Sequence, residues 1–151
     1  MTIDAQSPAL LGAGTSNGRE VPINVEEGRR RTIVEGVQPQ IDGGRYPIKR
    51  IVGDTVVVEA DCFADGHDVL SCAVLYRQAG ASQWQFAPMT FLINDRWRGS
   101  FVVDTVGSYE YTVASWIDRF KTWEHAMEKR IAVGQDIRVD LLIGAELVAE
   151  A

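Results

Sequence analysis

Carboxylates, a histidine and a glycine gather in one short stretch, and these residue types can bind a metal or transfer protons. Asp65, Gly66, His67 and Asp68 are consecutive, and Asp61 lies shortly before them. A metal site would need further ligands at fixed spacing, and catalysis by paired carboxylates would need two acids held across a pocket. The sequence supplies neither pattern. Because Asp and Gly also suit turns, we expect a turn here, with no catalytic residue, no metal and no cofactor.

The other histidine and the paired glycines are not part of a catalytic or phosphate-binding motif. A nucleophile activated by His125 would need a Ser or Cys within hydrogen-bond reach, and the sequence has no G-x-S-x-G elbow. Gly43 and Gly44 are not followed by the strand and helix of a phosphate-binding loop. We expect a partly exposed histidine on a helix and a glycine turn.

Four tryptophans are better suited to a ligand, because an aromatic ring can stack on a sugar ring. They are Trp84, Trp97, Trp116 and Trp123. Tryptophan is more often mostly buried, and this interpretation places Trp97 and Trp116 in a core and Trp84 over an edge. The only substrate-binding candidate is therefore Trp84.

The two cysteines, Cys62 and Cys72, are too few for a fold held together by disulfides. They lie on neighbouring predicted strands, so a cross-strand bridge is geometrically open to them. The commoner alternative is a pair of buried thiols in a reducing cytosol.

The elements that would position these residues are mainly strands, because apolar and polar residues alternate through most of the chain. Strands are predicted over 31–37, 46–51, 55–63, 69–78, 83–86, 96–103 and 108–118. The last of these is apolar on both faces, which is typical of a central strand. Short strands separated by turns, without intervening helices, predict an antiparallel β-sandwich.

After Asp118 the apolar spacing changes to three and four residues, which predicts an amphipathic helix ending near Gly134. Asp136 can cap a second helix, although residues 137–141 also alternate like a strand. The apolar stripe has no evident partner in the chain and predicts an interface. The interface candidates are Phe120, Trp123, Met127, Leu142 and Leu147.

Composition divides the chain and limits its partners. Residues 1–29 are rich in Gly, Ser, Thr and Asn and predict a disordered leader; residues 30–119 form the sandwich, and 120–151 the helical extension. A net charge of -6 argues against nucleic acid and anionic membranes as partners. No secretory signal or membrane-spanning run is present in the sequence, so we expect a cytoplasmic protein.

Three stretches carry a resemblance to a known family. The first is 37–50, with the phrase D-G-G-R-Y-P-I-K-R, and the second is 61–68, with F-A-D-G-H-D. The third runs from Asn94-Asp95-Arg96-Trp97-Arg98-Gly99 through Gly107-Ser108-Tyr109-Glu110-Tyr111 to 116–123. From about residue 31 to the end, the sequence resembles the N-terminal domain of the bacterial alpha-1,4-glucan:maltose-1-phosphate maltosyltransferases, in the alpha-amylase superfamily.

The resemblance implies an immunoglobulin-like sandwich interrupted by a helical insertion, and a bacterial pathway that moves maltosyl units from maltose 1-phosphate to an α-glucan. It also implies a front domain that makes homodimer contacts and supports a catalytic barrel. Such a barrel needs about 250 residues. It does not fit in this chain, so no catalytic residue can be carried over, and we expect a fragment of a longer protein or a truncated product.

Three functions follow as hypotheses. The leading one is a non-catalytic accessory domain that docks to the absent barrel or to a second copy. The alternative is a stand-alone α-glucan-binding module that uses Trp84. The third, an enzyme in its own right, has the least support, because no catalytic constellation is evident.

Overall fold

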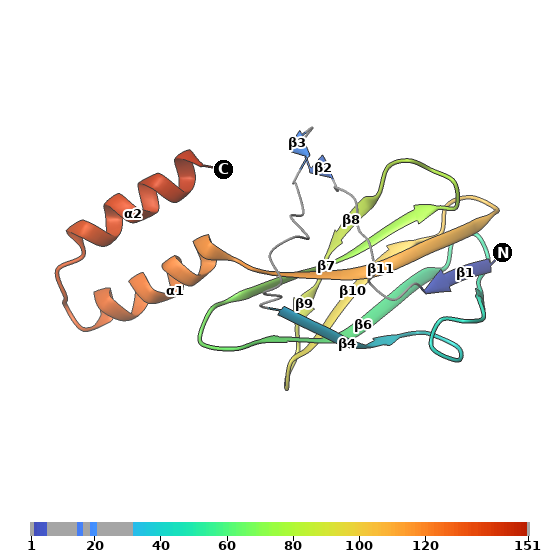
Figure 1. Cartoon of the computed structure of the whole chain (residues 1–151), viewed down its shortest axis with the longest axis horizontal. Coiled ribbons are helices and arrows are strands. Elements are labelled where there is room, and N and C mark those ends of the chain that lie inside the picture. Colours follow the sequence, from blue (N-terminus) through green and yellow to red (C-terminus); the bar gives the residue numbers. More distant parts are fainter. Residues whose placement is uncertain (1, 6–14, 17–18, 21–31, 151) are drawn as a thin grey trace.

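The computed structural model describes residues 2–5, 15–16, 19–20 and 32–150. The main elements among them are two facing β-sheets, and two helices follow the sheets (Figure 1). Three short strands fall within the predicted leader: β1 (Thr2–Ala5), β2 (Thr15–Ser16) and β3 (Arg19–Glu20). The rest of that leader lies outside the described residues, and its disorder stays a prediction.

Together with β1, the strands that follow form the two sheets. They are β4 (Thr32–Gln38), β5 (Ile48–Lys49), β6 (Thr55–Ala64), β7 (Leu70–Gln78), β8 (Gln85–Pro88), β9 (Thr90–Phe91), β10 (Arg96–Val102) and β11 (Ser108–Ile117). One sheet, called here the β7–β11 sheet, has the order β5-β1-β11-β7-β8, and the other, the β6–β10 sheet, has the order β4-β6-β10-β9. Apart from the parallel pair of β1 and β11, the described pairings are antiparallel.

This arrangement confirms the predicted mainly β fold, an antiparallel β-sandwich with a C-terminal helical extension. β11, predicted to be central, lies between β1 and β7. The finer assignment as immunoglobulin-like stays a prediction.

Alternation along the strands builds the core between the sheets. On β6, Val56, Val58 and Ala60 are 0% exposed, whereas Val57 between them is 47% exposed. Burying a side chain of valine size contributes about 1.5–3 kcal/mol. The same period places Tyr109, Tyr111 and Val113 of β11 in the core.

Tyr111 also ties the core to the loop after β4. Its hydroxyl donates a hydrogen bond to the carbonyl oxygen of Pro39, which gives the buried polar atom a partner. Burial raises the pKa of Tyr111 to about 12, so the phenol stays neutral and remains a donor.

One predicted strand is much shorter than expected. Of residues 46–51, only Ile48–Lys49 form a strand. Pro47 has no backbone N–H to donate to a ladder, and Tyr46 instead forms an isolated bridge with Ile41. The chain between these two residues is the predicted glycine turn, with φ of 66° at Gly43.

Helix α1 (Arg119–Ala132) begins directly after β11, where the period of the sequence changes. Asp118 is its N-cap, and the carboxylate accepts a hydrogen bond from the backbone N–H of Lys121 at 2.9 Å. Ser71 of β7 donates to the same carboxylate at 2.7 Å. This N-cap therefore also joins the helix to the sandwich.

Helix α2 (Arg138–Ala149) confirms the helical alternative for the last segment and excludes the strand over 137–141. The N-cap is Ile137 rather than Asp136, although Asp136 accepts a hydrogen bond from the backbone N–H of Arg138 at 3.2 Å. The two helices pack as a hairpin that extends beyond the end of the sandwich (Figure 1). Neither has the length and apolar character that crossing a membrane requires, among the residues the structure describes.

Candidate functional site

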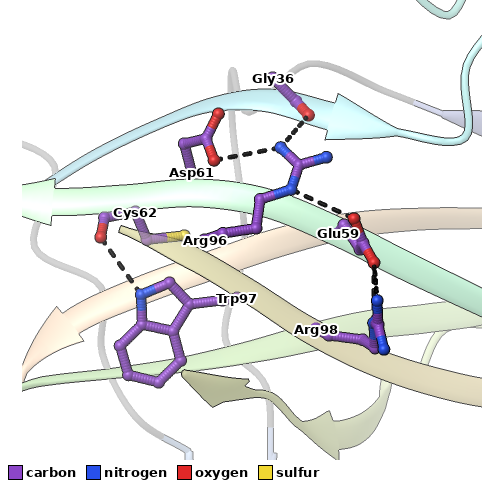
Figure 2. Close-up of polar contacts among 7 residues, drawn as sticks. All are labelled: Gly36, Glu59, Asp61, Cys62, Arg96, Trp97 and Arg98. Carbon is purple, nitrogen blue, oxygen red and sulfur yellow. Dashed lines mark hydrogen bonds and ion pairs between the residues drawn. The ribbon is translucent and has the colours of Figure 1, made fainter. Parts of the chain in front are cut away.

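A ladder of alternating charges crosses the outer face of the β6–β10 sheet. The strand register places Arg96 opposite Asp61 and Arg98 opposite Glu59. Arg96 donates to Asp61 at 3.1 Å and to Glu59 at 3.2 Å, and Arg98 donates to the other oxygen of Glu59 at 2.7 Å (Figure 2). These four residues are called here the charge ladder, in which Arg96 contacts both acids and Arg98 contacts Glu59.

A bulge in β4 completes the contacts of Arg96. The register between β4 and β6 shifts between Glu35 and Gln38, and Gly36 within the shift has φ of 61°. Its carbonyl oxygen accepts a hydrogen bond from Arg96 at 3.3 Å (Figure 2). A Cβ at this position would lie 2.8 Å from a carboxylate oxygen of Asp61, so glycine suits both the backbone angle and the space.

The electrostatics of the ladder suit charge pairing rather than proton donation. Hydrogen bonds from Arg98 and Arg96 lower the pKa of Glu59 below its ordinary value. The pKa of Asp104 is likewise lowered, chiefly by the hydrogen bond from the Tyr109 hydroxyl. A general acid in glycoside chemistry needs the opposite shift, a raised pKa. These carboxylates are therefore ionised near neutral pH.

A shallow groove of about 390 Å³ opens beside the ladder. The described residues that line it are Gln38, Pro39, Arg50, Thr55, Val57 and Glu59. None of these is aromatic, so the groove does not offer a stacking surface for a sugar ring.

The charge ladder was not predicted from the sequence. Its signal was present as two acids and two arginines, each pair spaced by two residues. The pattern has meaning only once β6 and β10 are aligned, because strand register decides which charges meet.

The acidic stretch with the histidine forms the loop between β6 and β7, which passes from one sheet to the other. Gly66 has φ of 101° there, as a turn requires. Asp61 pairs with Arg96. Within the part of the chain that the structure describes, no three His, Cys, Asp or Glu side chains gather as a metal site would need. His125 is exposed on α1, with its ring 4.0 Å from Glu128.

Three of the four tryptophans lie in the sandwich and differ in burial. Trp97 packs against the core and donates to the carbonyl oxygen of Cys62 at 3.2 Å (Figure 2). Trp84 is half-buried, with the guanidinium of Arg77 4.3 Å from its ring centre. Trp116 was expected in the core, and this interpretation is wrong. It faces outward from β11 and is 39% exposed, because the alternation of the strand turns Tyr111 and Val113 into the core and Trp116 away from it.

The interface candidates divide into two groups. Met127 is buried, and Trp123 and Leu147 are half-buried. The Trp123 indole donates to the carbonyl oxygen of Asp140 at 2.7 Å, which joins the two helices. Phe120 and Leu142 remain 42% and 68% exposed, so these two are the candidates available to a partner.

The two cysteines do not lie on adjacent strands of one sheet, as the sequence had suggested. β6 and β7 belong to opposite sheets, so Cys62 and Cys72 enter the core from opposite sides. Both are buried free thiols. A cross-strand disulfide within one sheet is therefore excluded, because the loop that connects β6 to β7 passes from one sheet to the other.

Comparison with known proteins places this chain in a family. A sequence profile described as alpha-1,4-glucan:maltose-1-phosphate maltosyltransferase, domain N/S, matches residues 30–151. The maltosyltransferase of Chlorobaculum tepidum is 48% identical over 122 residues, which cover 81% of this chain and 18% of that protein. That of Myxococcus xanthus is 43% identical over 122 residues, covering 78% of this chain and 18% of that protein. The maltosyltransferase of Burkholderia pseudomallei is 30% identical over 144 residues, covering 95% of this chain and 13% of that protein.

The chain thus spans less than a fifth of the length of these relatives. The profile match covers most of the chain and includes strands β4 to β11, the charge ladder and both helices. This chain belongs to the alpha-1,4-glucan:maltose-1-phosphate maltosyltransferase family and corresponds to its domain N/S.

Proposed function

We propose that this chain is the non-catalytic N-terminal accessory domain of a maltosyltransferase of α-glucan biosynthesis. Maltosyl transfer from maltose 1-phosphate would then take place on a catalytic barrel, and this domain would serve docking and dimerisation. The family match supports the assignment as an accessory domain. The lowered pKa values of Glu59 and Asp104 support the lack of catalysis, because neither carboxylate suits a general acid. Two free buried thiols suit a reducing compartment, and we place the protein in the cytoplasm.

The observation that carries the docking role is the apolar surface of α2. Gly144 faces α1, and Val139, Leu142 and Ile143, which share the face of the helix turned away from α1, are 70%, 68% and 46% exposed. Apolar surface that gathers on one element is typical of an interface. We assign it to a second copy of this chain, since the same helix on both copies can form a two-fold symmetric contact.

Light scattering on the purified chain tests this assignment. We expect a dimer whose fraction rises with concentration, and Leu142→Asp should shift it to monomer by placing a charge in the contact. Val106→Asp is the matched control, because Val106 is 80% exposed in a loop of the sandwich. A chain that stays monomeric at every concentration would contradict dimerisation through α2.

The non-catalytic part of the proposal has its own test. The chain alone, given maltose 1-phosphate and a glucan acceptor, should release no phosphate above the rate without protein. Turnover by the chain alone would overturn the accessory role.

A further inference from the structure

Three aromatic side chains share the outer face of the β7–β11 sheet. Cys72 and Val74 of β7 point into the core, so Ala73 and Leu75 point outward. The register places Phe86 of β8 opposite Leu75 and Trp116 of β11 opposite Ser71. Trp84 precedes Phe86 by two residues, a spacing that keeps a strand face, and it stacks on Arg77.

The rings of Phe86 and Trp116 converge across β7. Their strands flank β7 on either side, which separates the two strands by about 10 Å, and the register also offsets the two residues by four positions along β7. The ring centres are nevertheless only 6.3 Å apart, with the planes tilted by 45°. Ala73 lies between them on β7, paired with Pro88 and Ala114, and it is 0% exposed although it faces outward. The small side chain leaves room for the two rings to meet above the strand.

The rings of Phe86 and Trp116 are partly exposed, and an ion pair lies beside Trp84. Phe86 is 49% exposed and Trp116 is 39% exposed. Next to Trp84, Arg77 forms an ion pair with Glu110 at 2.7 Å, and both side chains are partly accessible at 27% and 21%. The face therefore combines aromatic surface with planar groups that can donate and accept hydrogen bonds.

We propose that this face is a binding site for an α-1,4-glucan chain, which would lie across Trp116, Phe86 and Trp84. A sugar ring has apolar C–H faces that pack on aromatic rings and hydroxyl edges that need hydrogen-bond partners, and this face offers both. Tilted rings suit a curved chain, and the α-1,4 linkage curves. An uncharged glucan is also compatible with the net charge of -6, which disfavours an anionic ligand.

The choice of an α-1,4-glucan rests on the proposed function, since the relatives are named for that acceptor. The site itself lies on the sheet, whereas the proposed dimer contact lies on α2. The glucan site and the dimer contact can therefore be tested separately. Leu142→Asp should remove dimerisation and leave glucan binding unchanged.

Titration calorimetry of the chain with maltoheptaose tests the site, with cellohexaose as the β-1,4-linked control. We expect saturable binding of maltoheptaose, weakened about tenfold by Phe86→Ala or Trp116→Ala, because each removes an aromatic contact. Phe91→Ala is the matched control. Phe91 is 52% exposed on the opposite sheet, and its loss should leave the affinity unchanged.

Phe86→Ala keeps the test decisive if Trp116→Ala fails to fold, since Phe86 lies on the edge strand β8. Absence of binding at millimolar maltoheptaose would overturn the site, as would equal binding of cellohexaose. Binding that survives Phe86→Ala but not Phe91→Ala would place it elsewhere. A change of molecular mass caused by Phe86→Ala would assign this face to a protein contact instead.

Discussion

Arg96 concentrates more polar contacts than any other side chain of the charge ladder. It donates to Glu59, Asp61 and the carbonyl oxygen of Gly36 and is 27% exposed, whereas Arg98 bonds Glu59 and is 55% exposed. We expect Arg96→Ala to lower the free energy of unfolding by on the order of 1 kcal/mol, since partly exposed ion pairs are screened by solvent. Arg98→Ala should cost less. Urea denaturation measures both, and a larger loss for Arg98→Ala would contradict the central role of Arg96.

The carboxylate of Asp118 should make the stability of the fold depend on pH. Partial burial opposes ionisation, but the backbone N–H of Lys121 and the Ser71 hydroxyl donate to the carboxylate and lower its pKa below the ordinary 3.8. A group with a lowered folded pKa stabilises the fold above its unfolded value, and that stability is lost as the pH falls through the folded pKa. Asp118→Ala should cost about 1 kcal/mol near neutral pH and progressively less as the pH falls below 3.8.

Denaturant titrations of Asp118→Ala from pH 7 to pH 3 measure this difference. Asp65→Ala is the matched control, because Asp65 is exposed in the loop between β6 and β7 and caps no helix, and it should have the smaller effect. A cost that stays constant across this range would show that the charge of Asp118 plays no part.

At the scale of elements, the close packing of α1 against α2 requires that residue 144 have no side chain. A Cβ at residue 144 would overlap the indole of Trp123. In an isolated helix, Gly→Ala stabilises by about 1 kcal/mol; here the overlap should reverse the sign and cost about 1–3 kcal/mol. Circular dichroism during urea unfolding measures the helical part. Trp123→Ala should remove the penalty in the double variant, and a Gly144→Ala chain that gains stability would contradict the close packing.

Element boundaries followed from the sequence wherever one period held. β6, β7, β10 and β11 begin and end within about two residues of the predicted positions, because alternation and turn residues agree there. The exposed face of Trp116 could not be predicted, since β11 is apolar on both sides and only tertiary packing distinguishes them. The charge ladder could not be predicted for a similar reason. Glu59 and Arg96 come together only through the pairing of β6 with β10, which are distant in the sequence.

At the scale of the whole molecule, the two thiols report on the contact between the sheets. Cys62 and Cys72 are 1% and 3% exposed. The neighbouring Cys62 thiol and burial in the core raise the pKa of Cys72, which lowers the fraction of reactive thiolate. Labelling either thiol requires the sheets to separate, and this opening approaches global unfolding in free energy.

We therefore expect a disulfide reagent such as 5,5′-dithiobis(2-nitrobenzoate) to leave both thiols of the native chain unmodified at pH 8 and to label both in denaturant. Their labelling rates should rise together with urea, because one opening exposes both. Ser100→Cys is the control, since Ser100 lies exposed on the outer face of β10, and this added thiol should react at once. Rapid labelling of Cys62 or Cys72 without denaturant, or rates that depend differently on urea, would mean that the sandwich opens locally rather than as a unit.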